Sequence, residues 1–157
     1  AAFVVAARSE KLRVLEINEA GTLSRFLRQM PGHRLVEYPA YDMSNLNIPS
    51  ESWDIVVHSD TLEHVADPLQ GLKECRRVLR AGGSCVFTVP IIVDRLSRSR
   101  EGLADSFHGN EQEVDSGLLV RTEFGADVWL LAAKAGFRKV SLSYLDFPAG
   151  IAIEMRK

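Results

Sequence analysis

Polar side chains follow three short apolar runs of the chain, at positions where they could bind a small ligand. The runs end in Glu16-Ile17-Asn18, in Glu37-Tyr38 and in His58-Ser59-Asp60. Their carboxylates, amide, imidazole and hydroxyls can hold hydroxyl groups or a cation. In an open parallel sheet, ligands bind beyond the carboxyl ends of the strands. The sequence therefore predicts a binding site at one edge of a sheet.

Strands and helices alternate along the chain, and this order predicts the sheet that positions these side chains. Short apolar runs predict strands, while apolar residues at helical spacing predict helices. The predicted strands are Leu12–Ile17, Arg34–Tyr38, Asp54–His58, Ser84–Val89, Lys139–Leu145 and Ile151–Met155. The predicted helices lie around Leu23–Leu27, over Pro68–Arg80 and over Glu123–Ala135.

Both longer helices carry signals at their ends. Asp67 caps the first, and Gly82 lies just past its end. Thr122 caps the second, and Gly136 stops it. The last two strands are joined around positions 148–150, and so short a connection indicates an antiparallel hairpin. The order as a whole indicates an α/β fold, with a mostly parallel sheet covered on both faces.

The composition is that of an ordinary globular protein and disfavours several classes. The 157 residues, 46% apolar and 25% charged, suit one domain over residues 1–157. A formal net charge of −2 gives no basic field for nucleic acid or an anionic membrane. No apolar run is long enough to span a bilayer, and Ala1–Ala7 lack the basic flank of a signal peptide. We expect a cytoplasmic protein.

The two cysteines lack the spacing of a metal site. Cys75 falls on a predicted helix and Cys85 on a predicted strand, so both are expected to be reduced thiols of the core. A reducing compartment fits this expectation. No metal ligand is assigned from the sequence.

The block from Trp53 to Pro90 carries the strongest family signal. It contains Trp53-Asp54-Ile55-Val56-Val57-His58-Ser59-Asp60, Leu62-Glu63-His64-Val65, Arg77-Val78-Leu79-Arg80-Ala81-Gly82-Gly83 and Val86-Phe87-Thr88-Val89-Pro90. This block closely resembles the second half of a class I S-adenosylmethionine-dependent methyltransferase domain, and a weaker resemblance covers most of Leu12 to Phe147. It implies a three-layer, Rossmann-like sheet with an antiparallel C-terminal strand, and S-adenosyl-L-methionine as the cofactor.

The connection between the second and third predicted strands is short. Only three residues separate Tyr38 from Asp42, so the helix that such domains usually carry here is expected to be missing. The expected fold is therefore shortened between these strands, which would leave a sheet face open for a partner.

The loop after the first strand departs from the family pattern. The resemblance assigns Glu16 as the acid that ends the strand, and the family's Gly-x-Gly-x-Gly is replaced by Asn18-Glu19-Ala20-Gly21-Thr22. Asn tolerates left-handed geometry better than other non-glycine residues, and Ala is the smallest replacement. Asn18 and Ala20 are thus expected to contact the cofactor. A plain strand-to-helix turn without a ligand is the alternative.

Further cofactor contacts are implied by the resemblance. A carboxylate at the second strand end, here Glu37 beside Tyr38, accepts both ribose hydroxyls; an ordinary surface glutamate is the alternative. Asp42 matches the acid that takes the adenine amino group, and Met43 the residue that covers the ring. The third strand end, His58 and Ser59, is expected to face the cationic sulfur.

Two histidines are candidate catalytic bases. Methyl transfer is a displacement in which the enzyme mainly positions donor and acceptor, and a base helps when the acceptor is a hydroxyl. His64 and His108 could take this role. Non-catalytic interpretations are favoured for both. His64 would be a structural residue that orients its loop, and His108 would simply be exposed to solvent.

Two further features have both a functional and a purely structural interpretation. Asp60, Glu63 and His64 resemble an element of quinone-biosynthesis O-methyltransferases in which a divalent metal is implied, although capping and hydrogen bonding are favoured here. The long segment 91–121 has little periodicity and is expected to be functional, mobile or both. Its arginines, Arg95, Arg98 and Arg100, form a mixed-charge loop or contact an anionic substrate.

The sequence thus predicts an S-adenosylmethionine-dependent methyltransferase that acts on a small-molecule or glycan-like acceptor. A non-catalytic module of the same fold, acting with a partner, is the alternative that the unusual loop supports. A dehydrogenase is disfavoured because no Gly-x-Gly-x-x-Gly follows the first strand. A nucleic-acid methyltransferase is disfavoured by the negative charge, and a homodimer is a candidate assembly.

Overall fold

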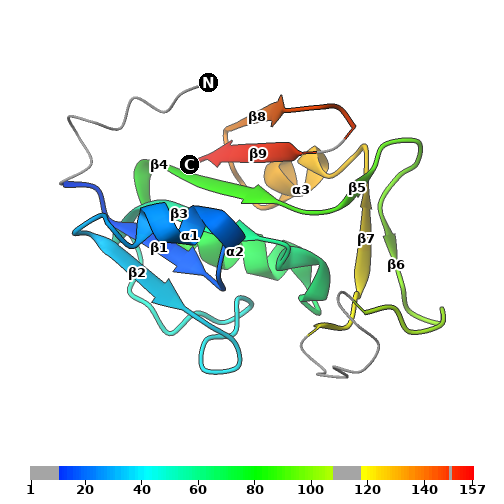
Figure 1. The fold of residues 1–157 in the computed structure, drawn as a ribbon, viewed down its shortest axis with the longest axis horizontal. Helices are drawn as coiled ribbons and strands as arrows, with labels where there is room; N and C mark the ends of the chain where they lie inside the picture. Colours follow the sequence, from blue (N-terminus) through cyan, green and yellow to red (C-terminus); the bar gives the residue numbers. More distant parts are fainter. Residues whose placement is uncertain (1–10, 108–117, 149) are drawn as a thin grey trace.

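The main sheet of the molecule has the predicted α/β topology. The computed structural model describes residues 11–107, 118–148 and 150–157 (Figure 1). Within these residues the sheet has six strands in the order β2-β1-β3-β4-β9-β8. Their bounds are Val14–Ile17 for β1, His33–Val36 for β2, Trp53–Ser59 for β3, Leu79–Thr88 for β4, Lys139–Tyr144 for β8 and Ile151–Arg156 for β9.

The strand directions confirm the expected mixed sheet. β1 pairs in parallel with β2 and β3, and β3 pairs in parallel with β4. β9 runs antiparallel to β4 and to β8, so the C-terminal hairpin is added to the parallel part as predicted. Because β1, β2 and β3 point the same way, their carboxyl ends meet at one edge of the sheet.

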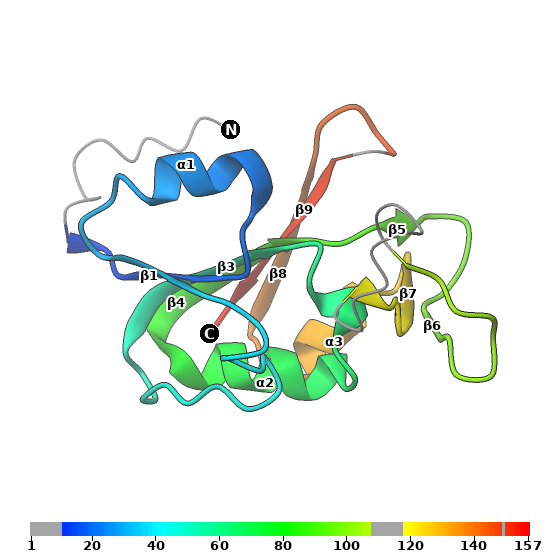
Figure 2. The same cartoon turned by 60° about the horizontal axis from the view of Figure 1, so that its bottom comes forward.

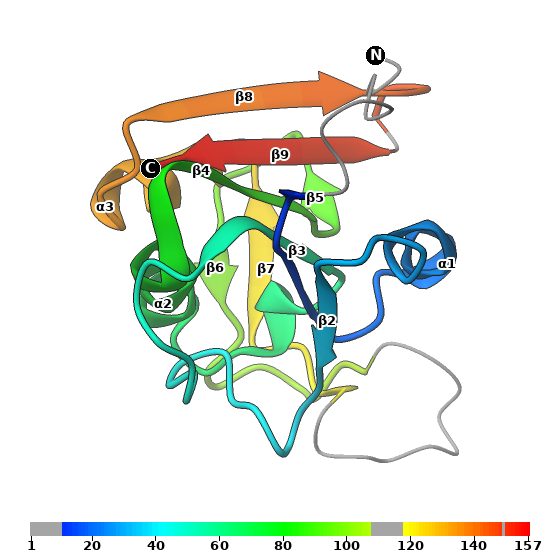
Figure 3. The same cartoon turned by 90° about the vertical axis from the view of Figure 1, so that its left-hand side faces the viewer.

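Helices lie on both faces of the sheet (Figures 2 and 3). A 3₁₀ turn, Gly21–Leu23, leads into the short α1, Ser24–Leu27, on one face. α2, Pro68–Val78, and α3, Trp129–Lys134, cover the other face, where the larger cluster of buried apolar side chains is found. No helix of the described residues is long and apolar enough to cross a membrane.

α2 begins as its sequence predicts. The Asp67 carboxylate accepts a hydrogen bond of 3.0 Å from the backbone N–H of Gln70, and Pro68 occupies the first turn. Leu72, Cys75 and Val78 are buried along its inner face. The helix then passes directly into β4, so Trp53 to Thr88 forms one βαβ unit.

The segment between β2 and β3 contains no helix or strand, which agrees with the expected shortening. Leu46 and its neighbours Met43 and Ile48 are buried in the larger core. The Arg77 guanidinium of α2 donates to the carbonyls of Leu46 and Ile48, each at 2.8 Å. These bonds hold the segment that carries Asp42 against α2.

The prediction of a helix over Glu123–Ala135 is wrong for its first half. Thr122–Gly125 is strand β7, which pairs with β5, Ile91–Ile92, and β6, Arg98–Ser99, in a small second sheet. A side chain at Gly125 would clash with the Arg95 carbonyl, so the backbones approach closely there. α3 starts only at Trp129 and ends before Gly136, which has a φ of +87°.

Candidate functional site

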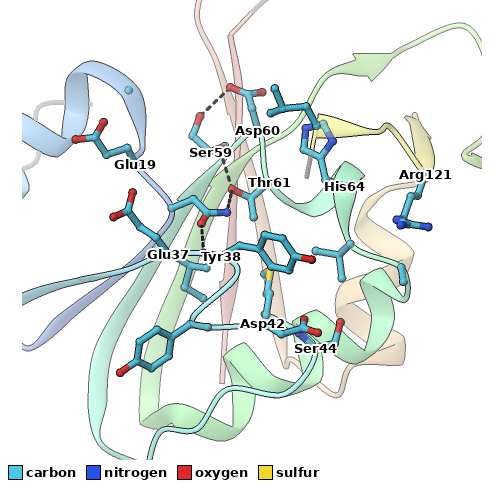
Figure 4. Close-up of a pocket in the computed structure, with 18 residues that line it drawn as sticks. Glu19, Glu37, Tyr38, Asp42, Ser44, Ser59, Asp60, Thr61, His64 and Arg121 are labelled. Carbon is cyan, nitrogen blue, oxygen red and sulfur yellow. Dashed lines mark hydrogen bonds between the residues drawn. The ribbon is translucent and has the colours of Figure 1, made fainter. Parts of the chain in front are cut away.

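A cavity of about 570 Å³ opens at the carboxyl ends of β1, β2 and β3 (Figure 4). This volume lies in the usual range of small-molecule sites. Predicted residues that line the cavity are Asn18, Glu37, Tyr38, Asp42, Met43, Ser59 and His64. The predicted residues Glu16, Ala20 and His58 are not among its lining, and His108 lies outside the described residues.

Asn18 joins the three strand ends. It has a φ of 55°, in the left-handed region that asparagine tolerates. Its side-chain oxygen accepts the backbone N–H of Tyr38 at 3.0 Å, and its side-chain nitrogen lies 3.4 Å from the hydroxyl of Thr61. The Thr61 hydroxyl donates in turn to the carbonyl of Ser59. Asn18 therefore braces the wall of the cavity as well as lining it.

Glu16 lies beneath the loop and holds it in place. Its carboxylate is fully buried and accepts the backbone N–H of Ala20 at 2.8 Å and the hydroxyl of Ser24 at 3.2 Å. The His33 imidazole lies 2.6 Å from the same carboxylate. Ala20 is buried in the smaller apolar cluster, beside Leu27. The structure places Glu16 and Ala20 as supports of the loop.

Glu37 and Asp42 present carboxylates to the cavity. The carboxylate of Glu37 makes no hydrogen bond or ion pair with any described residue, so both its oxygens are available to a ligand. One Asp42 oxygen accepts the backbone N–H of Ser44 at 2.7 Å, which orients the group. Met43 is 3% exposed and provides an apolar surface beside them.

The charges of the lining are mostly negative. Glu19, Glu37, Asp42 and Asp60 supply four carboxylates, whereas Arg121 is the one Lys or Arg among the described lining residues. Figure 4 shows Glu19 and Glu37 on one side, with His64 and Arg121 on the other. Such a cavity favours a cationic ligand that has hydroxyl or amino donors.

His58 points into the protein. The ring is 1% exposed and stacks on Phe87, with 4.6 Å between the ring centroids. Ser59, the next residue of the strand, lines the cavity, where its hydroxyl is 3.0 Å from the Asp60 carboxylate. Consecutive residues of a strand point to opposite faces, which explains why only one of the pair reaches the site.

His64 lines the cavity, and Glu63 is buried beside it. His64 Nδ1 lies 3.0 Å from the carbonyl of Leu119, and its Nε2 lies 3.8 Å from Glu63 Oε1. Glu63 is 1% exposed. Burial raises the pKa of its carboxyl to about 7, and the charge of Asp60 adds to this, while a backbone hydrogen bond opposes it.

Arg121 was not found from the sequence. It comes from the segment before β7 and lines both this cavity and a second one of about 620 Å³. Its backbone N–H donates to the carbonyl of Glu63. No local pattern distinguishes it from other surface arginines. It is brought to the cavity by contacts with residues more than fifty positions away in the sequence. Thr61 was also missed, although its place beside Asp60 at a strand end could have indicated it.

The arginines of the 91–107 segment are engaged within the small sheet. Arg95, Arg98 and Arg100 all bind the Glu123 carboxylate. Hydrogen bonds from Arg98, Arg95 and Arg100 lower the pKa of Glu123 to about 2. The three arginines thus pair with a carboxylate of the same small sheet, and of the three only Arg100 lines the second cavity.

Comparisons with known proteins agree on one family. The model of the methyltransferase domain matches residues 3–87. A protein of Mycolicibacterium smegmatis named a probable S-adenosylmethionine-dependent methyltransferase is 33% identical over 84 residues, which cover 50% of this chain and 32% of the relative. The ubiquinone biosynthesis O-methyltransferase of Parvibaculum lavamentivorans is 35% identical over 48 residues, or 31% and 19% of the two chains.

Solved structures show the same fold. An S-adenosylmethionine-dependent methyltransferase from Mesorhizobium loti superimposes with a TM-score of 0.61 at 14% identity, covering 95% of this chain and 92% of the other. The match to the smegmatis relative spans about a third of that protein's length.

Proposed function

The chain belongs to the methyltransferase domain family, and from this premise we propose that it transfers a methyl group from S-adenosylmethionine to a small-molecule or glycan-like acceptor. The observation that carries the proposal is the pair of carboxylates, Glu37 and Asp42, that face the cavity at the strand ends. The acceptor would enter from the second cavity, which shares Ala66 and Arg121 with the first.

The lining fits the cofactor by its chemistry. The two available oxygens of Glu37 suit the vicinal hydroxyls of a ribose. Asp42, oriented by Ser44, suits the adenine amino group, and the buried Met43 suits the face of the ring. The surplus of carboxylates suits a ligand that carries an ammonium and a sulfonium. Ser59 and Asn18 would complete the wall near the methionine portion.

The cofactor supplies a methyl group on a cationic sulfur. The rest of the cofactor, which departs from that methyl group, is already a good leaving group. The protein therefore has to orient the acceptor and, when the acceptor is a hydroxyl, remove its proton. A neutral His64 that donates Nδ1–H to the Leu119 carbonyl carries its basic lone pair on Nε2. We assign His64 as the base on this ground. His108 stays a candidate outside the described residues.

The charge of the molecule supports the proposed acceptor class. A nucleic acid would meet a protein of formal net charge −2 and a cavity with four carboxylates, which repel phosphates. A neutral or cationic small molecule, or a glycan, is compatible with this surface. A homodimer and a cytoplasmic location stay predictions, which sedimentation and cell fractionation test.

Calorimetric titration of S-adenosylmethionine and S-adenosylhomocysteine tests the cofactor site. We expect micromolar binding by the wild-type chain. Asp42→Ala should bind about 10–100-fold more weakly, because a hydrogen bond to a charged group is worth about 1.5–3 kcal/mol. Asp94→Ala is the matched control, since Asp94 is exposed and lines neither cavity.

Three results of the titration would contradict the proposal. Absence of binding at millimolar ligand would favour the non-catalytic module. An equal loss of affinity in Asp42→Ala and Asp94→Ala would move the cofactor away from this cavity. Unchanged affinity in Asp42→Ala would do the same. Glu16→Ala is less informative, because the loss of its bonds to Ala20 and Ser24 would disturb the loop whether or not a ligand binds.

A further inference from the structure

His58, Cys75 and Cys85 meet in the core, away from both cavities. His58 comes from β3, Cys75 from α2 and Cys85 from β4. One donor atom from each side chain lies within 4.8 Å of the other two. The side chains are 1%, 0% and 0% exposed, and the two cysteines are free thiols. None of the three lines a cavity.

The imidazole of His58 is not fully hydrogen-bonded. Both ring nitrogens are buried without a hydrogen bond of normal geometry among the described residues, and the Cys85 thiol is the polar group that interacts with the ring. A buried polar group without a partner costs about 1–3 kcal/mol, and such groups in native structures often indicate a missing water or ion. Its stacking on Phe87 engages the face of the ring and neither ring nitrogen.

The three donors are of the kinds that soft metal ions prefer. Thiolate sulfur and neutral imidazole nitrogen are the usual ligands of Zn²⁺ in proteins, and thiolates also select Cu⁺. The donors come from three elements and lie within 4.8 Å of one another, close enough for one ion to contact all three. We propose that His58, Cys75 and Cys85 bind one soft metal ion, for which Zn²⁺ is the charge-matched choice.

Charge neutrality favours zinc in this environment. Binding of Zn²⁺ releases one proton from each thiol to solvent, and the resulting pair of thiolates balances the 2+ charge while the imidazole stays neutral. The buried group then carries no net charge, which avoids the large cost of an isolated charge in a medium of low dielectric. With three protein donors, a zinc ion keeps one coordination position open.

The site would tie together the elements beneath the cavity. β3 carries Ser59 to the cavity edge one residue after His58, while α2 and β4 complete the same βαβ unit. A metal ion that links these elements would stabilise the fold. It takes no part in methyl transfer, so this proposal does not depend on the proposed function.

Metal analysis of the untagged chain tests the site. The protein is stripped with a chelator, refilled separately with Zn²⁺ or with Cu⁺ under reducing conditions, desalted and measured by mass spectrometry. We expect one ion per chain. Cys85→Ala and His58→Phe should each retain less than a tenth of this amount, whereas the control Asp94→Ala should retain all of it. Refilling with Co²⁺ should add thiolate-to-metal absorption, which the two variants lack.

X-ray absorption of the refilled wild-type chain keeps the test valid if the variants fail to fold. Two sulfur neighbours at about 2.3 Å and one nitrogen at about 2.0 Å are expected for zinc. A shell of oxygen and nitrogen only, stoichiometric metal in both variants, or no bound Zn²⁺ or Cu⁺ would overturn the proposal. Cofactor titration of the stripped chain separates the two proposals, because cofactor binding should persist without the metal.

Discussion

At the scale of residues, Asn18 shows how a side chain can replace a glycine and add a function. Its left-handed φ of 55° is the conformation for which the family uses glycine. Its amide then bonds to Tyr38 and Thr61, which glycine cannot do. This departure from the family pattern thus stabilises the cavity wall, and it explains how the unusual loop keeps its shape.

Substitution of Asn18 tests this role. Asn18→Gly keeps the backbone geometry but loses both side-chain bonds. Asn18→Ala loses the same bonds and strains the backbone, so it should be less stable than Asn18→Gly by about 1 kcal/mol. Urea unfolding measures the difference. Equal stability of the two variants would mean that the left-handed backbone conformation at this position has no free-energy cost for a residue with a side chain.

The buried Glu63 makes stability depend on pH. Its folded pKa, about 7, lies above the ordinary value of 4.5. Between these values the unfolded chain loses the proton that the folded chain keeps, so stability falls as pH rises through this window and then levels. Glu63→Gln removes this slope, and above pH 7 it should be more stable than the wild type by up to about 3 kcal/mol.

Urea unfolding from pH 4 to pH 8 measures the effect of Glu63→Gln. The two proteins should have similar stability near pH 4 and should diverge as pH rises. The exposed Glu101 supplies the control, because Glu101→Gln should follow the wild-type curve. Parallel curves for Glu63→Gln and the wild type would refute a raised pKa.

At the scale of elements, β7 illustrates why local periodicity was misleading. Phe124, Val128 and Ala135 have helical spacing, and all three are buried. Yet Glu123 is bound by three arginines from residues 95–100, and Gly125 packs on the backbone there. These long-range contacts pair the segment as a strand, and a helix forms only after Val128. Tertiary pairing overrides the local preference.

Glu123→Gln should weaken this small sheet. Without the carboxylate, three guanidinium groups repel one another, and we expect a loss of about 1–3 kcal/mol at pH 7. The pKa of Glu123, about 2, lies below its ordinary value, so its contribution is present above about pH 4.5 and is lost as pH falls toward 2.

Thermal unfolding at pH 7 and at pH 3 checks this sign. The difference in Tm between the wild type and Glu123→Gln should shrink at the lower pH. Glu19→Gln is the control, because its ion pair with Arg28 is more than half exposed. Its effect should stay below about 1 kcal/mol. A constant gap between the wild type and Glu123→Gln at both pH values would contradict the ion-pair explanation.

At the scale of the whole molecule, α2, α3, the main sheet and the small sheet share one large core. The segment between β2 and β3 is pinned to α2 by Arg77, although it has no regular structure. Phe124 of β7 is buried in the same apolar cluster as Leu15 of β1. We therefore expect the chain to unfold as one cooperative unit, as the single domain predicted from its length would.

A calorimetric scan with and without S-adenosylhomocysteine tests this expectation together with the ligand site. Ligand at about 100 times its Kd should add about 2.7 kcal/mol to the free energy of unfolding. This raises Tm by about 5–10 °C for a chain of this size. One transition should move as a whole. Two transitions, of which only one moves, would mean that the small sheet unfolds separately.

The sequence alone was enough to predict the strands of the main sheet, the well-capped α2, the C-terminal hairpin and the polar strand ends. These features depend on local signals: apolar runs, a capping aspartate, a proline in the first turn and turn residues. The family resemblance was needed to predict the cofactor. Even the absence of a helix between β2 and β3 could be predicted, because the three residues between Tyr38 and Asp42 are too few to form one.

Only the tertiary structure decided which polar residues share a site. It turned His58 inward and Ser59 outward, put Glu16 beneath the loop, and brought Arg121 to the cavity edge. It also brought Cys75 and Cys85 to His58, although their spacing in the chain indicates no metal site. Side-chain direction and contacts between distant segments are set by packing of the whole chain, and local sequence does not encode them.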